Sequence, residues 1–406
     1  MMTYLQPEEL LKQPPWIEHR PKKDPRDLRV LDPACGSGHF LLYAFDLLER
    51  IYEEAWADPE SPASEITGRA LREEFETLAD LRREIPRLII EHNLHGIDID
   101  PRAVQIAALA LWLRAQKTWK NLGLKAAERP RIRRSNIVTA EPMPGEEDMR
   151  REFIEALRPK VLGQLTDVVF EKMKLAGEAG SLLKIEEEIR DAVAEAKKQW
   201  LEGPKPEQAV LFPELVEPKP EQRRLRFDLT GVTDERFWEQ AEDRILEALE
   251  HYAERAENGR AGRRRLFAED AARGFAFIDL CRKRYDVVLM NPPFGEPAKK
   301  SKVFIVKAYP RTKNDVYAAF VERGLDLIHK GGMLGAITSR TGFFLSSFTK
   351  WREQVLLEAA KPTVFADLGY GVMDAAMVEA AAYVLAKPIV RIPSYAHRFT
   401  SQLRGG

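Results

Sequence analysis

The sequence predicts an α/β fold in which helices wrap a parallel sheet, and three observations support this prediction. Short β-rich runs alternate with helical runs between residues 28 and 140. The same alternation resumes at residue 285, after a long stretch of charged helical sequence. The first β-rich run ends in an acidic residue and a Gly-Ser-Gly turn that leads into a helix. Strands and helices in alternation are typical of βαβ units.

Strands and helices are expected in turn along the first half. A strand covers residues 29–34, and the helix after it carries apolar residues at helical spacing from residue 38 to residue 56. A second strand covers residues 94–100. Because proline is favoured in the first turn of a helix, a strong helix is expected over residues 101–116. A weaker third strand is expected over residues 131–138.

The middle of the chain has a different character. Residues 141–284 have the pattern of long, charged, amphipathic helices, and prolines interrupt them between residues 203 and 220. Because proline cannot sit inside a helix, we predict a helical insertion with a Pro-rich connector at 203–220. The insertion separates a first half at 28–140 from a second half at 285–406, and residues 1–27 form an N-terminal extension.

The second half returns to the α/β pattern. Strands are expected over residues 285–290 and 333–339. A helix is expected over residues 314–332, and another helical stretch continues through Trp351. The apolar runs at residues 363–369 and 377–387 complete the expected sheet.

Composition limits the class of protein. The chain has 406 residues, of which 44% are hydrophobic and 31% are charged, as in a soluble globular protein. No apolar run is as long as a membrane span, and the N-terminus lacks the pattern of a secretory signal, so a cytoplasmic protein is expected. Cys35 and Cys281 are too few and too far apart for a disulfide framework or a zinc cluster, and no metal is expected.

Basic residues are unevenly distributed along the chain. The formal net charge is −1, yet residues 299–313 contain six basic residues and no acidic one. A run of this kind is either a solvated loop or a contact for a polyanion such as DNA. Under the second interpretation, Lys299, Lys300 and Lys302 contact phosphate groups.

The turn after the first strand has the residues of a ligand site. The sequence "VLDPACGSGHF" puts Asp32 at the end of a strand, and Gly36 and Gly38 in the turn before a helix. Glycines let the backbone approach a ligand closely, and N–H groups at a helix start attract an anion. The third glycine of a dinucleotide fingerprint is missing, so the motif alone indicates either a nucleotide-like ligand or a plain tight turn.

Two acidic residues end the second strand. Ligands of open α/β sheets bind beyond the carboxyl ends of the strands, so Asp32, the glycine turn and Asp98 are expected to line one crevice. In that crevice Asp98 suits the hydroxyl groups of a ribose. Asp100 alternates with Asp98 along the chain and is expected to cap the helix that begins at Pro101.

The tetrapeptide "NPPF" at residues 291–294 ends an apolar strand with residues that favour neither helix nor sheet. Both prolines fix φ and lack an N–H, so the backbone is stiff and presents carbonyl oxygens. The amide oxygen of Asn291 and the carbonyl oxygen of Pro292 can each accept one hydrogen of an exocyclic –NH2 group. Phe294 offers a face to a planar ring swung out of a DNA stack. The alternative is a strand terminator with a buried phenylalanine, but the preceding asparagine and the upstream glycine turn favour the first interpretation.

Together, "DPACGSG", "GIDIDP" and "NPPF" resemble the motifs of amino-group DNA methyltransferases, which use S-adenosylmethionine and methylate N6 of adenine. The sequences around the first and third motifs resemble more narrowly the PglX-type adenine-specific methyltransferase of bacteriophage-exclusion (BREX) systems. The motif-bearing blocks cover a little over half of the chain. The resemblance implies a Rossmann-like class I S-adenosylmethionine-dependent methyltransferase core with a largely α-helical insertion.

The resemblance also implies site residues. Those for the methionine end of the cofactor are Asp32, Ala34, Gly36 and Gly38. It assigns Asp98 to the ribose of the cofactor and Asn136, in "SNIV", to the amino group of the cofactor's adenine. The catalytic residues at the target adenine are Asn291, Pro292, Pro293 and Phe294.

The expected reaction is therefore transfer of a methyl group from S-adenosylmethionine to adenine N6 in DNA, in a BREX or restriction-modification-like phage-defence system. The expected partners are double-stranded DNA, a recognition domain or subunit that reads the major groove, and other defence proteins, but no membrane. A catalytic core without its own recognition domain is expected. Two alternatives are methylation of a glutamine amide in a protein and a non-catalytic subunit that only binds the cofactor. The basic run favours a polyanion, and intact Asn291 and Phe294 argue against a silent subunit.

Overall fold

The computed structural model describes residues 21–202, 227–230, 261–372 and 378–389, together with isolated positions between 232 and 247. The expected connector at 203–220 and most of the expected N-terminal extension lie outside the described residues. The chain forms two compact units, each treated separately below. The core unit comprises Met1–Ala140, Glu178–Leu183 and Lys283–Gly406, and the helical unit comprises Glu141–Gly177 and Lys184–Arg282.

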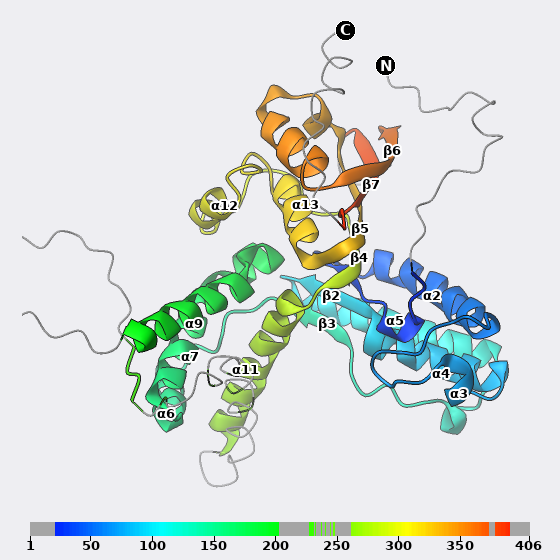
Figure 1. Ribbon diagram of the computed structural model, residues 1–406, viewed down its shortest axis with the longest axis horizontal. Helices are drawn as coiled ribbons and strands as arrows, with labels where there is room; N and C mark the ends of the chain where they lie inside the picture. Colours follow the sequence, from blue (N-terminus) through cyan, green and yellow to red (C-terminus); the bar gives the residue numbers. More distant parts are fainter. Residues whose placement is uncertain are drawn as a thin grey trace, which may run out of the picture. The chain divides into compact units, whose positions relative to one another are not determined.

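A seven-stranded sheet forms the centre of the core unit, with the strand order β3-β2-β1-β4-β5-β7-β6. All of these strands except β1 are labelled in Figure 1. β7 is antiparallel to both of its neighbours, and every other neighbouring pair is parallel. This doubly wound order confirms the expected Rossmann-like class I methyltransferase fold. The strands are β1 (Val30–Asp32), β2 (Leu94–Asp98), β3 (Asn136–Thr139), β4 (Tyr285–Met290), β5 (Ile328–Ser339), β6 (Lys361–Gly369) and β7 (Ala380–Ala386).

The strand order reverses direction between β1 and β4. Val30 pairs with Leu94 of β2 on one side, and Leu31 pairs with Val288 of β4 on the other. The chain moves from β1 towards β2 and β3, but from β4 towards β5. A reversal of this kind is where open α/β sheets bind ligands, beyond the carboxyl ends of the strands. The two strongest sequence motifs follow these two strands.

Helices on the β1–β3 side of the core unit share one apolar core with these strands. In α5, Ala107, Leu111, Ala115 and Trp119 recur every four residues and are all buried. They pack with buried residues of α2 and α4 in a single cluster. The helices of the core unit are α2 (His39–Ala57), α3 (Leu71–Glu74), α4 (Leu78–Leu88), α5 (Pro101–Asn121), α12 (Lys302–Ala308) and α13 (Val316–Leu327).

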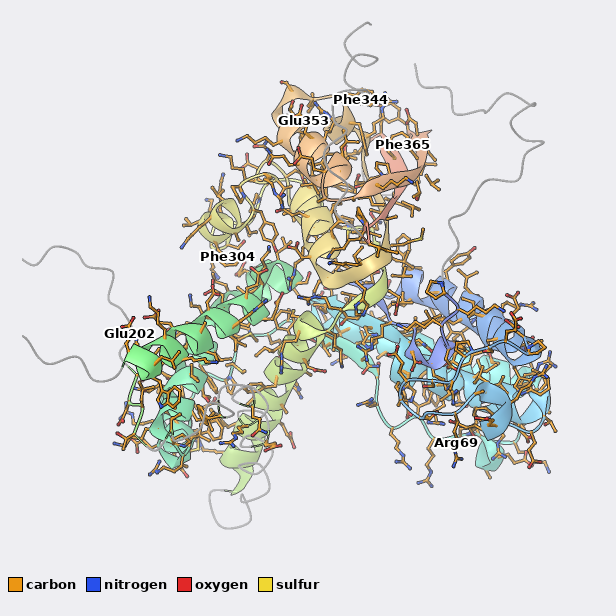
Figure 2. All side chains as sticks on the ribbon, viewed as in Figure 1. Arg69, Glu202, Phe304, Phe344, Glu353 and Phe365 are labelled. Atoms are coloured by element: carbon orange, nitrogen blue, oxygen red, sulfur yellow. The ribbon has the colours of Figure 1, made fainter. Side chains whose placement is uncertain are left out.

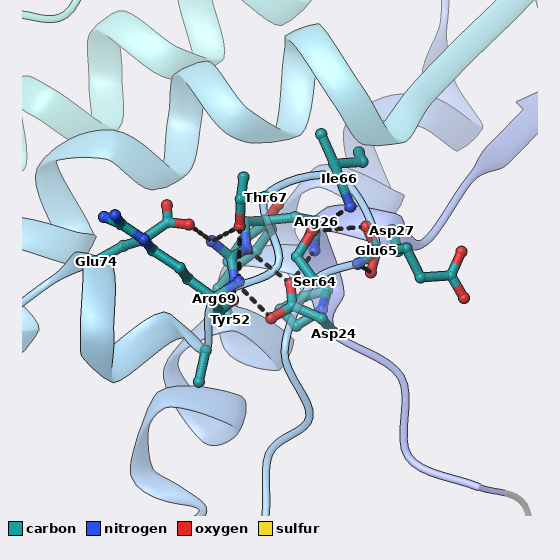
Figure 3. A network of polar contacts seen from close by, with 12 residues as sticks. Asp24, Arg26, Asp27, Tyr52, Ser64, Glu65, Ile66, Thr67, Arg69 and Glu74 are labelled. Carbon is teal, nitrogen blue, oxygen red and sulfur yellow. Dashed lines mark hydrogen bonds and ion pairs between the residues drawn. The ribbon is translucent and has the colours of Figure 1, made fainter.

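A buried polar network fastens the chain just before β1 (Figure 3). The Arg26 side chain is 3% exposed, and its guanidinium pairs with Asp24 at 2.8 Å and with Glu74 at 2.7 Å. The Asp27 carboxylate accepts a hydrogen bond from the Ser64 hydroxyl at 2.8 Å. Partners of this kind are needed because an unpaired charge is costly to bury. The network therefore ties the segment before α4 to the entry of the sheet.

The helical unit is described by itself. A Cβ at Gly163 of α7 would lie 2.6 Å from the carbonyl oxygen of Ile154 in α6, so this glycine allows the two helices to approach closely. Arg150 adds ion pairs from α6 to Asp167 and Glu171 of α7. The helices are α6 (Glu147–Ala156), α7 (Lys160–Lys172), α8 (Ala176–Ala179), α9 (Ile185–Glu202) and α11 (Ala261–Arg282), of which α8 ends in the core unit. Glu202 at the end of α9 is labelled in Figure 2.

Two expected elements of the second half differ from the structure. The helix expected over residues 314–332 ends at Leu327, and the next strand begins at Ile328 instead of residue 333. Gly331 has φ of +82°, which a helix does not accommodate. The stretch expected to be helical through Trp351 is not one continuous helix. It begins with the 3-10 turns Arg340–Phe343 and Ser346–Phe348, and only residues 349–350 are α-helical before the π-helix Trp351–Leu357.

Among the helices that the structure describes, none combines the length and the hydropathy that a membrane crossing requires.

Candidate active site

The turn between β1 and α2, residues 33–38, depends on two glycines in the left-handed region. Gly36 has φ of +51° and Gly38 has φ of +84°. A Cβ at Gly38 would lie 3.0 Å from the Cβ of Ala107, so this glycine lets α2 begin against α5. A Cβ at Gly36 would meet no atom within 4 Å, so the backbone there faces open space. Open space beside a tight turn is what close approach of a ligand requires. We call residues 33–38 the cofactor turn.

Asp98 joins the cofactor turn to the end of β2. Its carboxylate accepts a hydrogen bond from the Gly36 N–H at 2.8 Å and one from the Asp100 N–H at 2.9 Å. The Cys35 N–H donates to the Ile97 carbonyl oxygen at 2.9 Å. The structure thus brings Asp98 and the glycine turn together. Because a carboxylate occupies the Gly36 N–H, this group of the turn is not available to an anion.

Asp100 caps α5, which confirms the prediction for this residue. Its side chain accepts a hydrogen bond from the Arg102 N–H at 2.9 Å, and Pro101 is the first residue of the helix. The exposed Arg102 side chain also pairs with the Asp100 carboxylate at 3.1 Å. Both of these interactions of the Asp100 side chain are therefore made at the start of α5.

Asp32 is the most deeply buried carboxylate of the site. It is 2% exposed, and it accepts a hydrogen bond from the Ala34 N–H at 3.1 Å. Burial, and to a smaller extent the charge of Asp98, raises the pKa of Asp32 to about 7 in spite of that hydrogen bond. Two carboxylates at one edge of the sheet favour a positively charged ligand, because a cation stabilises the ionised form of a buried acid.

Asn136 does not lie at this edge. It is the first residue of β3 and pairs with His95, whereas Asp98 pairs with Thr139 at the other end of the strand. Three residues of a strand span about 10 Å. The Asn136 amide is buried and donates to the carbonyl oxygens of Ile90 at 3.3 Å and Glu91 at 3.0 Å. The predicted cofactor contact of Asn136 is therefore wrong, because the side chain belongs to the amino edge of the sheet.

The "NPPF" tetrapeptide, which we call the target loop, leaves β4 beside the cofactor turn. β4 and β1 are parallel neighbours, so the residues that follow Met290 and those that follow Asp32 meet at one edge. In this loop Pro292 is buried, Asn291 and Pro293 are exposed, and Phe294 is half-buried. The two predicted groups of site residues therefore follow adjacent parallel strands and lie at the carboxyl ends of both.

Asp315 holds the end of the target loop. Its carboxylate accepts hydrogen bonds from the Gly295 N–H at 2.9 Å and from the Tyr317 N–H at 3.2 Å, the second of which caps α13. Gly295 has φ of +105°, which a side chain would disfavour. The Phe294 ring meets Tyr317 edge to face, with centroids 6.0 Å apart. Sequence reasoning missed Asp315 and Tyr317. The pattern "ND" before an apolar helix signals a cap, but it does not identify the loop that the cap also binds.

Two phenylalanine residues, Phe343 and Phe344, follow β5, the strand next to β4. Phe343 is surrounded by Trp351, Phe365 and Tyr383, with centroids between 4.7 and 5.3 Å away. Phe344, labelled in Figure 2, is instead 68% exposed, with the Arg340 guanidinium 5.6 Å from its ring centroid. The carboxyl edge of the sheet thus presents a second aromatic surface that sequence reasoning did not single out.

The three lysines predicted to contact DNA are all exposed. Lys300 pairs with Glu178 at 2.9 Å, and Lys302, the first residue of α12, pairs with Glu296 at 2.8 Å. No carboxylate partner of Lys299 appears among the described residues. Phosphate contacts by Lys300 and Lys302 would therefore have to replace existing ion pairs, and Lys299 is the best placed of the three.

Neutralising these lysines tests the DNA contact. Each lost phosphate contact should flatten the slope of log affinity against log salt concentration by up to ~0.9, because fewer counterions are released. We expect Lys299→Ala to change the slope most, because Lys300 and Lys302 already pair with Glu178 and Glu296. Fluorescence anisotropy with duplex DNA at several salt concentrations gives the slope. An unchanged slope in the triple variant would identify a solvated loop.

No group of three or more His, Cys, Asp or Glu side chains that could hold a metal ion occurs within the described part of the chain.

Comparison with known proteins identifies the family. Residues 92–371, which include the target loop, match the model of the Eco57I restriction-modification methylase, and residues 21–136 match that of the MmeI DNA-methyltransferase domain. The chain belongs to the Eco57I restriction-modification methylase family. The resemblance expected from the motifs is confirmed, because the chain is similar to curated adenine-specific methyltransferases of the PglX and BrxX type.

Two of these relatives are much longer than this chain. The adenine-specific methyltransferase BrxX of Escherichia coli O9:H4 (strain HS) is 25% identical over 376 residues, which cover 89% of this chain and 25% of BrxX. The adenine-specific methyltransferase PglX of Lacticaseibacillus casei (strain Zhang) is 25% identical over 343 residues, 82% of this chain and 21% of PglX. The chain therefore spans about a quarter of the length of the curated relatives it matches.

The solved structures have a lower sequence identity to this chain than the curated relatives have. The Type IIL restriction-modification enzyme MmeI in complex with DNA aligns with a TM-score of 0.40 and 11% identity, over 91% of this chain and 32% of MmeI. At this TM-score the likeness carries no argument about the site.

Proposed function

We propose that this chain transfers the methyl group of S-adenosylmethionine to the N6 amino group of adenine in DNA, within a BREX or restriction-modification-like defence system. The observation that supports this most strongly is that the cofactor turn and the target loop leave adjacent parallel strands at one edge of the sheet. Holding two reactants side by side removes much of the entropic barrier to a bimolecular reaction. The adenine specificity of the similar BrxX and PglX proteins supports the choice of base.

The residues of the cofactor turn fit this cofactor. S-adenosylmethionine supplies a methyl group on a positively charged sulfur. Asp32 and Asp98 make the edge acidic, and the open space at Gly36 leaves room for close approach. Each Asp98 carboxylate oxygen accepts one N–H and keeps a second lone pair, which suits the hydroxyl groups of the ribose.

The target loop binds and orients the amine. The Asn291 amide oxygen and the Pro292 carbonyl oxygen each accept one hydrogen of the exocyclic –NH2 group, which turns the nitrogen lone pair towards the methyl group. Phe294 stacks on the extruded base, and its contact with Tyr317 keeps the ring in place. Asp315 fixes the backbone at Gly295 and so limits the freedom of the whole loop. No strong general base is required for this arrangement.

Asp98→Ala should weaken binding of S-adenosylmethionine by roughly 1–3 kcal/mol, because it removes an acceptor of the ribose and leaves the Gly36 N–H unpaired. Asp98→Asn, which keeps one acceptor oxygen, should lose less. Isothermal titration calorimetry gives the affinities, and Asp100→Ala serves as the control because Asp100 caps α5 only. Equal affinities of wild type and Asp98→Ala would exclude the ribose contact.

Labelled S-adenosylmethionine tests the substrate class. The chain is incubated with mixed-sequence DNA in one reaction and with a protein extract in another, and the label in each polymer is counted. We expect label in DNA. Label confined to protein would instead support methylation of a glutamine amide, since the Asn-Pro-Pro arrangement suits any planar –NH2 group.

A further inference from the structure

The segment Glu178–Leu183, which we call the anchor segment, belongs to the core unit although the helical unit contains the chain on both sides of it. It includes the last residues of α8 and the 3-10 turn Gly180–Leu183. All four residues of that turn are buried. Because this turn is buried, its backbone N–H and C=O groups need hydrogen-bond partners from other segments of the core unit.

One side of the anchor segment contacts the cofactor half of the site. Ser181 is completely buried, and its hydroxyl donates to the carbonyl oxygen of Pro33 at 3.0 Å. Pro33 is the first residue of the cofactor turn. Gly180 has φ of +54°, and a Cβ there would lie 3.1 Å from Ile99, the residue after Asp98. The anchor segment therefore touches the chain on both sides of the acidic edge.

The other side contacts the elements that carry the target loop. The Ser181 carbonyl oxygen accepts a hydrogen bond from Nε of Arg323 in α13 at 2.8 Å, and the Leu182 carbonyl oxygen accepts one from the Tyr309 hydroxyl at 2.9 Å. Arg323 and Tyr309 are both completely buried. α13 is the helix whose capping residue, Asp315, holds Gly295 at the end of the target loop.

The backbone where the chain leaves the anchor segment is strained. Lys184 has φ of +50° and is the only non-glycine residue with positive φ in the described part of the chain. A side chain in this region costs energy, and such residues persist where surrounding contacts determine the conformation. The hydrogen bonds of Ser181 and Leu182 are contacts of this kind.

We propose that the anchor segment couples the cofactor turn to the target loop, and that Ser181 and Tyr309 are positioning residues for binding of the cofactor. The Ser181 hydroxyl fixes the Pro33 carbonyl group, while Arg323 and Tyr309 fix the backbone of the segment from α13 and the chain before it. Neither residue touches the reacting atoms. The inference rests on the proposed function for the identity of the ligand, but the contacts themselves do not depend on it.

Two variants test the coupling. Ser181→Ala leaves a buried carbonyl group without its donor, and Tyr309→Phe does the same at Leu182, on the side away from the cofactor. We expect each to raise the Kd for S-adenosylmethionine about five- to twentyfold. At saturating cofactor, kcat should change less than KM. The effect of Tyr309→Phe is the sharper test, because a residue with only a local role there would leave cofactor affinity unchanged.

Thr166→Val is the matched control. The Thr166 hydroxyl is equally buried and donates to the Leu162 carbonyl oxygen at 2.8 Å, but it lies in the helical unit. Its loss should lower stability without raising the Kd. Wild-type affinity in both Ser181→Ala and Tyr309→Phe would overturn the proposal, and so would an equal loss of affinity in Thr166→Val.

Amide hydrogen exchange provides a readout that needs no cofactor. In the free protein, both variants should exchange faster than wild type in peptides that contain the cofactor turn, because local opening becomes easier. Thr166→Val should not change these peptides. Unchanged exchange in Ser181→Ala and Tyr309→Phe would overturn the coupling. Faster exchange in both variants, together with a wild-type protein that binds no S-adenosylmethionine, would instead refute the proposed function alone.

Discussion

Asn291→Ala should abolish methyl transfer while leaving the affinity for S-adenosylmethionine nearly unchanged. The amide oxygen contacts the reacting amine and not the cofactor, and its hydrogen bond strengthens as the nitrogen becomes tetrahedral. An interaction that exists mainly in the transition state lowers kcat when it is removed. The rates come from single-turnover methylation assays, and the affinity comes from calorimetry.

Phe294→Ala is the companion variant, because it alters the same loop in a different way. Loss of a stacking surface costs on the order of 1–3 kcal/mol per base, so capture of the extruded adenine should weaken. A mismatch opposite the adenine lowers the cost of extrusion and should restore part of the activity of Phe294→Ala but none of Asn291→Ala. Restoration of both variants by a mismatch would contradict the role of Asn291 in the chemical step.

Asp32→Asn should stabilise the cofactor-free protein at pH 8 and should have little effect near pH 4. Burial raises the pKa of Asp32 from its ordinary 3.8 to about 7, so the folded state holds this proton more tightly than the unfolded state. Stability from this residue is complete below pH 3.8 and is lost as the pH rises to about 7. Each pKa unit is worth about 1.4 kcal/mol, so the variant should gain a few kcal/mol above pH 7. Urea unfolding across this pH range measures the gain.

The ionisation of Asp32 should affect cofactor affinity in the opposite sense to stability: affinity should increase as the pH rises, whereas stability decreases. A cationic ligand favours the ionised form of Asp32, so the affinity of wild type should rise as the pH passes through about 7, with release of a proton. Asp32→Asn should bind weakly at every pH. Asp100→Asn is the control, because the exposed Asp100 has its pKa lowered by Arg102. A pH-independent difference in stability between wild type and Asp32→Asn would contradict the raised pKa.

The sequence predicts strands, caps and strand-end positions well where the signals are local. The apolar run of β4 was expected at residues 285–290, the bounds that the structure has. Asp100 was expected as a cap, because a carboxylate before Pro101 is a local signal. The strand-end positions of Asp32 and Asp98 also follow from local patterns, and the parallel order of strands then brings them together.

Errors arose where the outcome depends on register or on distant partners. Asn136 was assigned from the letters "SNIV", but its register against His95 puts it at the amino edge. The start of β5 at Ile328 was missed because apolar spacing continued the pattern of α13, whereas pairing with Tyr285 decides the strand. The contact of Ser181 with Pro33 joins residues 148 positions apart, and no local pattern predicts such a contact.

The most direct test of the central claim is the identity of the methylated atom. DNA with mismatched adenines is incubated with the chain and S-adenosylmethionine carrying a deuterated methyl group, and its nucleosides are then separated and weighed by mass spectrometry. The account predicts deuterated N6-methyldeoxyadenosine with wild type and none with Asn291→Ala. A wild-type chain that binds the cofactor but leaves adenine unlabelled, alone and with a recognition subunit added, would contradict it.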